Sequence, residues 1–142
     1  MIMSKVAVVY WSGTGNTEEM AGAVVEGAKA KGADVTLFEI ESFSIEKMDD
    51  FDAIAFGCPA MGDEVLEETV FEPVFVSCEP KLVGKNIALF GSYGWGDGEW
   101  MRNWEDTCRE KGANLVCESV ICADAPDADA EAACRELGAA LV

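Results

Sequence analysis

A short stretch rich in glycine and hydroxyl side chains, Ser12-Gly13-Thr14-Gly15-Asn16-Thr17, is the feature that most constrains this chain. It follows an apolar run typical of a buried strand, and a helical pattern begins at Thr17. Such a turn brings free backbone N–H groups to the positive end of a helix dipole, where hydroxyl groups can add further hydrogen bonds. The stretch therefore predicts a phosphate-binding loop.

The spacing within this loop restricts the kind of phosphate. A Walker A loop needs a Lys directly after its second Gly, and no Lys lies between Lys5 and Lys29. A dinucleotide fingerprint needs a small residue three positions after Gly15, where the chain has Glu18. We therefore expect neutral donors that hold a monophosphate. The alternative is an ordinary strand-to-helix turn.

Two later segments also combine glycine with apolar or aromatic residues: Pro59-Ala60-Met61-Gly62-Asp63-Glu64 and Ser92-Tyr93-Gly94-Trp95-Gly96-Asp97-Gly98. With the first stretch they resemble the three FMN-binding loops of flavodoxins, most closely the short-chain flavodoxins of anaerobic bacteria. The resemblance runs over essentially the whole chain and implies one FMN-binding domain, residues 1–142. The residues that it places at the cofactor are Ser12, Gly13, Thr14, Gly15, Asn16, Thr17, Pro59, Ala60, Met61, Gly62, Asp63, Glu64, Ser92, Tyr93, Gly94, Trp95 and Gly96.

The resemblance also implies roles for some of these residues. Met61 and Trp95 would lie on opposite faces of the flavin ring, and Glu64 would accept a hydrogen bond from ring N3–H. The carbonyl of the Gly62–Asp63 peptide would turn towards ring N5 once that atom carries a proton. The alternatives are a core position for Met61, a helix-terminal acid for Glu64 and an ordinary surface turn around Trp95. Tyr93 is either a ring contact or a support.

Two further tryptophans and an acidic segment near the C-terminus are not expected to contact the cofactor. Trp100 and Trp104 are four residues apart, which predicts that both pack on the apolar face of a helix. Related proteins often have an amide where this chain has Ala123-Asp124-Ala125-Pro126, so a contact from this segment to the ribityl chain is not expected.

Strand-like and helix-like segments alternate along the chain, which predicts an α/β fold with a doubly wound parallel sheet covered on both faces. The resemblance adds the order 2-1-3-4-5 and a three-layer sandwich. The region 42–50 has the weakest pattern and is at most a short helix. The predicted strands are Val6–Trp11, Val35–Ile40, Ala53–Cys58, Ile87–Gly91 and Leu115–Cys122, and the predicted helices are Thr17–Lys31, Glu67–Cys78, Gly98–Lys111 and Asp127–Leu141.

The charge balance restricts the partners. The chain has 27 acidic and 10 basic residues and a formal net charge of −17. Nucleic acid and anionic membranes are poor partners for such a surface, whereas a basic protein partner is favoured. General acidity that keeps the protein soluble is the alternative. We expect a monomer that docks transiently with basic-faced redox proteins.

The residue types present also exclude several kinds of chemistry. The absence of His removes the usual general base and the commonest metal ligand. The six Cys lack the spacing of a zinc or iron–sulfur site, so we expect reduced, mostly buried thiols in a cytoplasmic protein and no metal. No segment reaches the ~20 apolar residues of a transmembrane helix.

The resemblance implies a low-potential one-electron carrier with non-covalently bound FMN, and not an enzyme. Two other functions remain open at this point. One is a flavodoxin-like NAD(P)H or quinone reductase, for which the chain is short. The other is a non-redox regulatory module with the same fold, for which the set Met61, Gly62 and Trp95 would have no purpose.

Overall fold

The computed structural model describes residues 4–62, 64–94 and 96–142. Helices and strands alternate through most of these ranges, as the sequence predicts. The strands are β1 (Lys5–Tyr10), β2 (Asp34–Glu39), β3 (Ala53–Gly57), β4 (Asn86–Tyr93), β5 (Asn114–Leu115) and β6 (Val120–Ala123). The α-helices are α1 (Asn16–Ala30), α2 (Phe71–Cys78), α3 (Glu99–Glu110) and α4 (Ala128–Ala140), and the 3-10 helices are η1 (Ile40–Ser42), η2 (Ile45–Asp50) and η3 (Glu79–Lys81).

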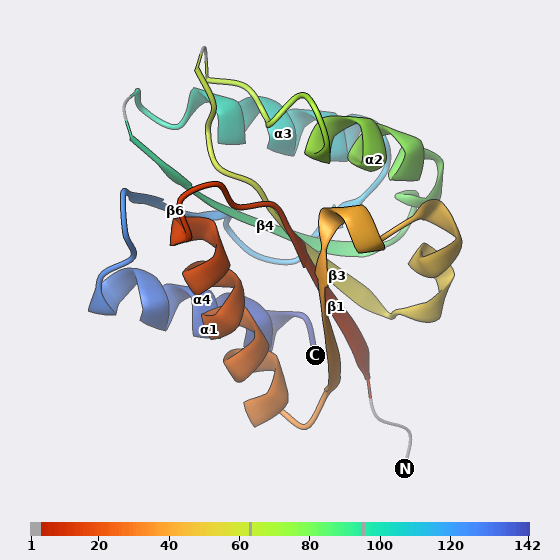
Figure 1. The fold of residues 1–142 in the computed structure, drawn as a ribbon. Helices are drawn as coiled ribbons and strands as arrows, with labels where there is room; N and C mark the ends of the chain where they lie inside the picture. The colour runs from red at the N-terminus through yellow and green to blue at the C-terminus, as the bar shows by residue number, and fades with distance from the viewer. Residues whose placement is uncertain (1–3, 63, 95) are drawn as a thin grey trace.

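The strands form one parallel sheet in the order β2-β1-β3-β4-β5, with β6 also paired to β4. Helices α1 and α4 cover one face of this sheet, and α2 and α3 cover the other (Figure 1). The predicted doubly wound fold and its strand order are therefore confirmed. The central strands β1 and β3 are almost wholly buried, as expected for a sheet covered on both faces.

The fifth strand differs from the prediction, because Leu115–Cys122 is not continuous. β5 pairs Leu115 with Ile87, and β6 pairs Val120 with Phe90. From Leu115 to Val120 the chain advances five residues, whereas β4 advances only three, from Ile87 to Phe90. The extra residues, between Cys117 and Ser119, do not pair with β4. Two short strands therefore stand where one was expected.

Helix α2 also differs, because it begins at Phe71 and not at Glu67. The Glu67 carboxylate is buried and accepts hydrogen bonds from the backbone N–H groups of Thr69, Val70 and Phe71 at 2.7–2.9 Å. These bonds satisfy N–H groups that a helix start leaves free. Pro73 lies in the first turn of α2, where its missing N–H breaks no helical bond.

The two faces of the sheet carry different cores. Between the sheet and α2/α3 the core is aromatic, with Phe56, Phe75 and Trp104 in edge-to-face contact. Between the sheet and α1/α4 the core is built mainly of alanine and valine. There the helices approach so closely that a side chain at Gly27 would collide with the backbone of Arg135. The sheet is thus held firmly from both sides, which fixes the loops at its edge.

Candidate functional site

Three loops meet at the carboxyl-terminal edge of the sheet. The first loop (Ser12–Thr17) follows β1, the second loop (Pro59–Glu64) follows β3, and the third loop (Ser92–Gly98) includes the end of β4 (Figure 1). A cavity of about 200 Å³ opens where they meet. Its lining residues are Trp11, Gly13, Thr14, Asn16, Pro59, Ala60, Met61, Ser92, Tyr93, Gly94 and Asp124. The structure thus brings together members of all three predicted loops.

The first loop is shaped by its own hydroxyl groups. Gly15 has a left-handed φ of 97°, and its N–H donates to Ser12 Oγ at 3.0 Å. Asn16 N–H donates to Thr14 Oγ1 at 3.4 Å, and α1 begins at Asn16. Because these hydroxyl oxygens act as acceptors, their protons remain available to an anion. The loop therefore presents neutral donors at a helix N-terminus, the arrangement that binds phosphate.

An acidic hollow lies on the other side of the first loop. It has a volume of about 410 Å³ and is bordered by Glu18, Glu39 and Glu41. It shares Trp11, Gly13 and Thr14 with the cavity. The hydroxyl of Tyr10 donates to Glu18 Oε2 at 2.9 Å. Burial and this carboxylate raise the pKa of Tyr10 to about 12. Tyr10 therefore stays protonated and keeps one of the three carboxylates engaged.

The second loop is closed by a small β-bridge. Met61 N–H donates to the carbonyl of Val65 at 2.8 Å, and Val65 N–H donates to the carbonyl of Met61 at 3.3 Å. Met61 is half-buried and lines the cavity, so it is not a core residue. Gly62 is exposed, and a Cβ at that position would meet no atom within 4 Å. Asp63 lies outside the described residues.

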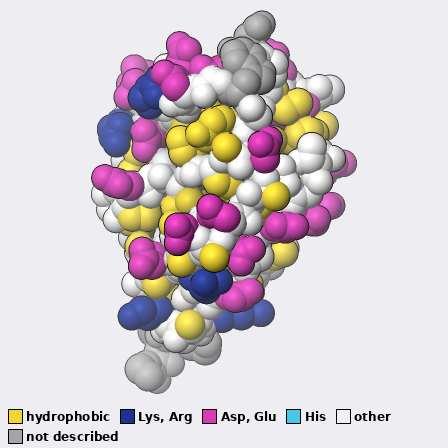
Figure 2. Space-filling view, turned by 90° about the vertical axis from the view of Figure 1, so that its left-hand side faces the viewer, with side chains coloured by type: hydrophobic (Ala, Val, Ile, Leu, Met, Phe, Trp, Pro, Cys, Tyr) yellow, Lys and Arg dark blue, Asp and Glu magenta, His cyan; other side chains and the backbone are white. Residues whose placement is uncertain are grey.

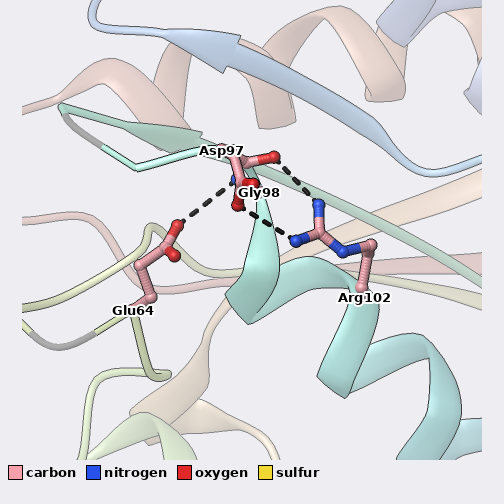
Figure 3. A network of polar contacts seen from close by, with 4 residues as sticks. All are labelled: Glu64, Asp97, Gly98 and Arg102. Carbon is pink, nitrogen blue, oxygen red and sulfur yellow. Dashed lines mark hydrogen bonds and ion pairs between the residues drawn. The ribbon is translucent and has the colours of Figure 1, made fainter.

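Glu64 lies between the second and third loops. Its backbone adopts a left-handed φ of 55°, which is uncommon for a residue with a side chain. Its Oε1 accepts a hydrogen bond from Gly98 N–H at 3.3 Å, at the start of α3 (Figure 3). Glu64 does not belong to the cavity lining but borders the groove between α2 and α3. The structure thus engages this carboxylate with the third loop.

The third loop begins at two backbone anchors. The carbonyl of Ser92 accepts from Ala60 N–H at 3.0 Å, and the carbonyl of Tyr93 accepts from Asp124 N–H at 2.8 Å. Tyr93 lines the cavity. The centroid of its ring lies 5.6 Å from that of the buried Trp100 ring, so Tyr93 both borders the site and packs against the core beneath it. Trp95 lies outside the described residues.

Trp100 and Trp104 pack in the core, as predicted, with 1% and 2% of their surfaces exposed. The indole N–H of Trp100 donates to the carbonyl of Cys58 at 3.1 Å. Cys58 immediately precedes the second loop, and Trp100 follows the third loop closely. This buried bond therefore joins the bases of the two loops.

Two residues of the cavity lining were missed by the sequence-based prediction. Trp11 directly follows β1, and its ring would contact a Cβ placed at Gly13. Asp124, with a left-handed φ of 57°, directly follows β6. Both positions follow a strand that ends at the same edge, and this position is the signal that could have identified them. Asp124 therefore borders the cavity, in the loop where related proteins often have an amide, although no contact from this loop to the ribityl chain was expected.

Acidic side chains dominate the surroundings of the cavity. Figure 2 views the molecule from the side where the strands end, and shows hydrophobic side chains gathered among separate Asp and Glu residues. No Lys or Arg occurs in the described cavity lining. Within the ranges that the structure describes, no cluster of three or more potential metal ligands is found, and no helix is long and apolar enough to cross a membrane.

The thiols lie mostly in the core. Four of the six cysteines are buried, and all six are free. Burial raises the pKa of Cys108 and of Cys134 to about 12, and it also raises the pKa of Cys122, which is half-buried. These thiols are therefore protonated at neutral pH and are poor nucleophiles.

The comparisons with known proteins agree on one family. The family model described as Flavodoxin matches residues 8–138. A flavodoxin of Megasphaera elsdenii is 47% identical over 135 residues, covering 95% of this chain and 96% of that protein. A flavodoxin of Clostridium beijerinckii is 46% identical over 131 residues, covering 92% and 94%. The solution structure of two-electron reduced Megasphaera elsdenii flavodoxin superimposes with a TM-score of 0.88 at 47% identity, covering 96% of this chain and 97% of that one.

Proposed function

The chain belongs to the flavodoxin family and is an FMN-binding electron carrier, and we propose that it transfers single electrons at low potential between oxidoreductases. The observation that carries this proposal is the meeting of the three loops around one cavity at the edge of the sheet. Bound FMN supplies the redox chemistry, and the protein supplies binding, orientation and electrostatics.

The first loop would hold the phosphate of FMN. Its donors would be the hydroxyls of Ser12 and Thr14, whose oxygens accept from the N–H groups of Gly15 and Asn16, together with the other N–H groups of the loop and the dipole of α1. A Cβ at Gly15 would meet no atom within 4 Å, so this side of the loop is open to an anion. The absence of a cation from Ser12–Thr17 supports a single phosphate rather than a pyrophosphate or triphosphate.

The second and third loops would hold the flavin ring. Met61 and Tyr93 give the cavity apolar walls, and the exposed backbone at Gly62 and Gly94 permits close approach. Trp95 would stack on the outer face of the ring, opposite Met61. Pro59, Ala60, Asp63, Glu64, Ser92 and Gly96 complete the proposed set in these two loops.

The charge of the protein would set the potential low. Each added electron is repelled by the surrounding carboxylates, and the described cavity lining contains no cation to offset them. Each ~1.4 kcal/mol of such bias moves a one-electron potential by about 59 mV. The same carboxylates would steer basic-faced redox partners into brief encounters with a monomer.

We also propose that the protein is not itself an enzyme and that it works in the cytoplasm. Support for the compartment comes from six free cysteines, which persist where thiols are kept reduced. Support for a carrier comes from the flavodoxin of Megasphaera elsdenii, 96% of which is covered by the match to this chain.

A spectroscopic experiment tests this proposal. The purified protein should carry FMN, visible in its absorption spectrum, and should accept electrons in two separate one-electron steps during a redox titration. It should not oxidise NAD(P)H steadily when given a quinone. A colourless protein that does not bind added FMN would overturn the proposal, and steady NAD(P)H oxidation would show a reductase instead.

A further inference from the structure

Arg102, in the first turn of α3, makes two hydrogen bonds to Asp97 near the end of the third loop, and we call this contact the Arg102 clamp. Arg102 Nη1 donates to the carbonyl oxygen of Asp97, and Arg102 Nη2 donates to Asp97 Oδ1, both at 3.0 Å (Figure 3). A guanidinium group is planar and presents its donors as a rigid fork. Two bonds from one fork therefore fix both the backbone and the side chain of Asp97.

The clamp also orients the next N–H group. The carbonyl of Asp97 and the N–H of Gly98 belong to the same planar peptide, and in a trans peptide they point in opposite directions. When Arg102 holds the carbonyl on one side, Gly98 N–H must point to the other side. There it donates to Glu64 Oε1 at 3.3 Å (Figure 3). Arg102 thus acts on Glu64 through one peptide unit.

The third loop is rich in glycine, so contacts that fix its conformation matter for its order. Gly94, Gly96 and Gly98 alternate along it, and the last two have left-handed φ values of 90° and 93°. Glycine loses much conformational freedom when it is fixed in one conformation. The backbone anchors described above end at Tyr93. The Arg102 clamp and the Glu64 bond hold the opposite end of the loop.

The Glu64 carboxylate lies directly against this loop. A side chain at Gly96 would collide with it, so the carboxylate occupies space that only a glycine leaves free. Glu64 itself belongs to the second loop and has a backbone conformation that few residues adopt. Its position is therefore set jointly by its own loop and by the Gly98 N–H group.

We propose that Arg102 is a positioning residue for flavin binding: through the Asp97–Gly98 peptide it places the Glu64 carboxylate and holds the second and third loops together. This inference rests on the proposed function, in which these two loops hold the ring. The ion pair is exposed, with side-chain exposures of 57% for Arg102 and 77% for Asp97, so its effect is modest.

Three variants test the proposal by calorimetric titration with FMN. Arg102→Gln should weaken FMN binding about 2–5-fold, the range typical of an exposed pair. Arg102→Lys keeps the charge but loses the fork, so it should restore only part of the affinity. Arg109→Gln is the matched control, because Arg109 is an exposed cation near the other end of α3, paired with Asp106. It should bind FMN as the wild type does.

The opposite pattern would overturn the proposal. Unchanged affinity in Arg102→Gln would show that the clamp does not matter. Full restoration by Arg102→Lys, or an equal loss in Arg109→Gln, would show that only positive charge on α3 is needed. A wild-type protein that fails to bind FMN would instead overturn the proposed function, so the two failures are distinguishable.

A second measurement follows the peptide itself. The amide resonance of Gly98 should shift when Glu64 is changed to Gln, because the charge of its acceptor is removed. In the Arg102→Gln background the same change should shift that resonance much less, because Gly98 N–H no longer points steadily at Glu64. An equal shift in both backgrounds would show that Arg102 does not orient this peptide.

Discussion

Thr17 Oγ1 lies 3.2 Å from Ser92 Oγ in a buried contact between the first turn of α1 and the end of β4. The two residues are 75 positions apart in the chain, and both are almost fully buried. The contact joins the first loop to the third, just as the Trp100–Cys58 bond joins the third to the second. The three loops are therefore tied to one another beneath the cavity.

Thr17→Val should destabilise the protein, because Val keeps the shape of Thr but leaves the Ser92 hydroxyl without this partner. We expect a loss of about 1–2 kcal/mol in the free energy of unfolding, measured by urea denaturation. Thr36→Val, at an exposed position of the edge strand β2, is the control and should change the stability by less than about 0.5 kcal/mol. Equal effects at both positions would show that the buried contact contributes nothing.

Glu67→Gln should destabilise the start of α2. Burial raises the pKa of Glu67, but the N–H groups of Thr69, Val70 and Phe71 together outweigh burial and lower it below its usual value of 4.5. We expect a loss of about 1–3 kcal/mol at neutral pH. Glu68→Gln, at the exposed neighbouring position, should have little effect.

The effect of Glu67→Gln should also depend on pH. A carboxyl group with a lowered folded-state pKa contributes stability above pH 4.5, its usual value, and this contribution is lost as the pH falls through the folded-state pKa. Urea denaturation at several pH values should therefore show the difference between wild type and variant shrinking below pH 4.5. A difference that is constant with pH would mean that the ionised carboxylate is not what the three N–H groups stabilise.

Trp95→Ala and Trp100→Ala should affect different properties of the protein: the first FMN affinity, the second folding stability. Loss of the proposed stacking face should weaken FMN binding by about 1–3 kcal/mol in Trp95→Ala. Trp100 is buried, so Trp100→Ala should reduce the free energy of unfolding by about 3–5 kcal/mol. Calorimetric titration and urea denaturation of both variants check the pair. If the two effects were exchanged, the assignment of the stacking residue would be wrong.

Gly62→Val should act on the redox potentials more than on the binding of oxidised FMN. The surroundings of Gly62 leave room for a side chain, but inversion of the Gly62–Asp63 peptide requires a conformation that a β-branched residue resists. The expected penalty is on the order of 1–3 kcal/mol. A redox titration should show a narrower or reversed gap between the two one-electron potentials. An unchanged gap would mean that this peptide does not respond to reduction.

The sheet was predictable because its central strands have continuous apolar runs, and because the glycine-rich loops follow three of them. The division of the fifth strand was not predictable. Leu115–Cys122 looks like one strand, and its surplus residues are recognised only from the register with β4. Similarly, the start of α2 depends on where the Glu67 side chain folds back, which helical periodicity does not report.

The cavity lining was predictable in part. Thr14, Met61 and Tyr93 lie in loops that resemble the FMN-binding loops of flavodoxins, and this resemblance identified them. Trp11 and Asp124 were missed because neither belongs to such a motif, and only the shared edge of the sheet brings them to the cavity. The bond between Glu64 and Gly98 was missed for a different reason, since it joins residues 34 positions apart through a single side-chain contact.

The comparison of FMN with riboflavin tests the central claim most directly, because the two flavins differ only in the phosphate assigned to the Ser12–Thr17 loop. Calorimetric titration of the flavin-free protein should show FMN binding at least about tenfold more tightly, which corresponds to ~1.4 kcal/mol or more from the phosphate. FAD should also bind more weakly than FMN, since the loop has no site for a pyrophosphate. Comparable affinities for FMN and riboflavin would contradict the account, because the loop would then not be a phosphate site.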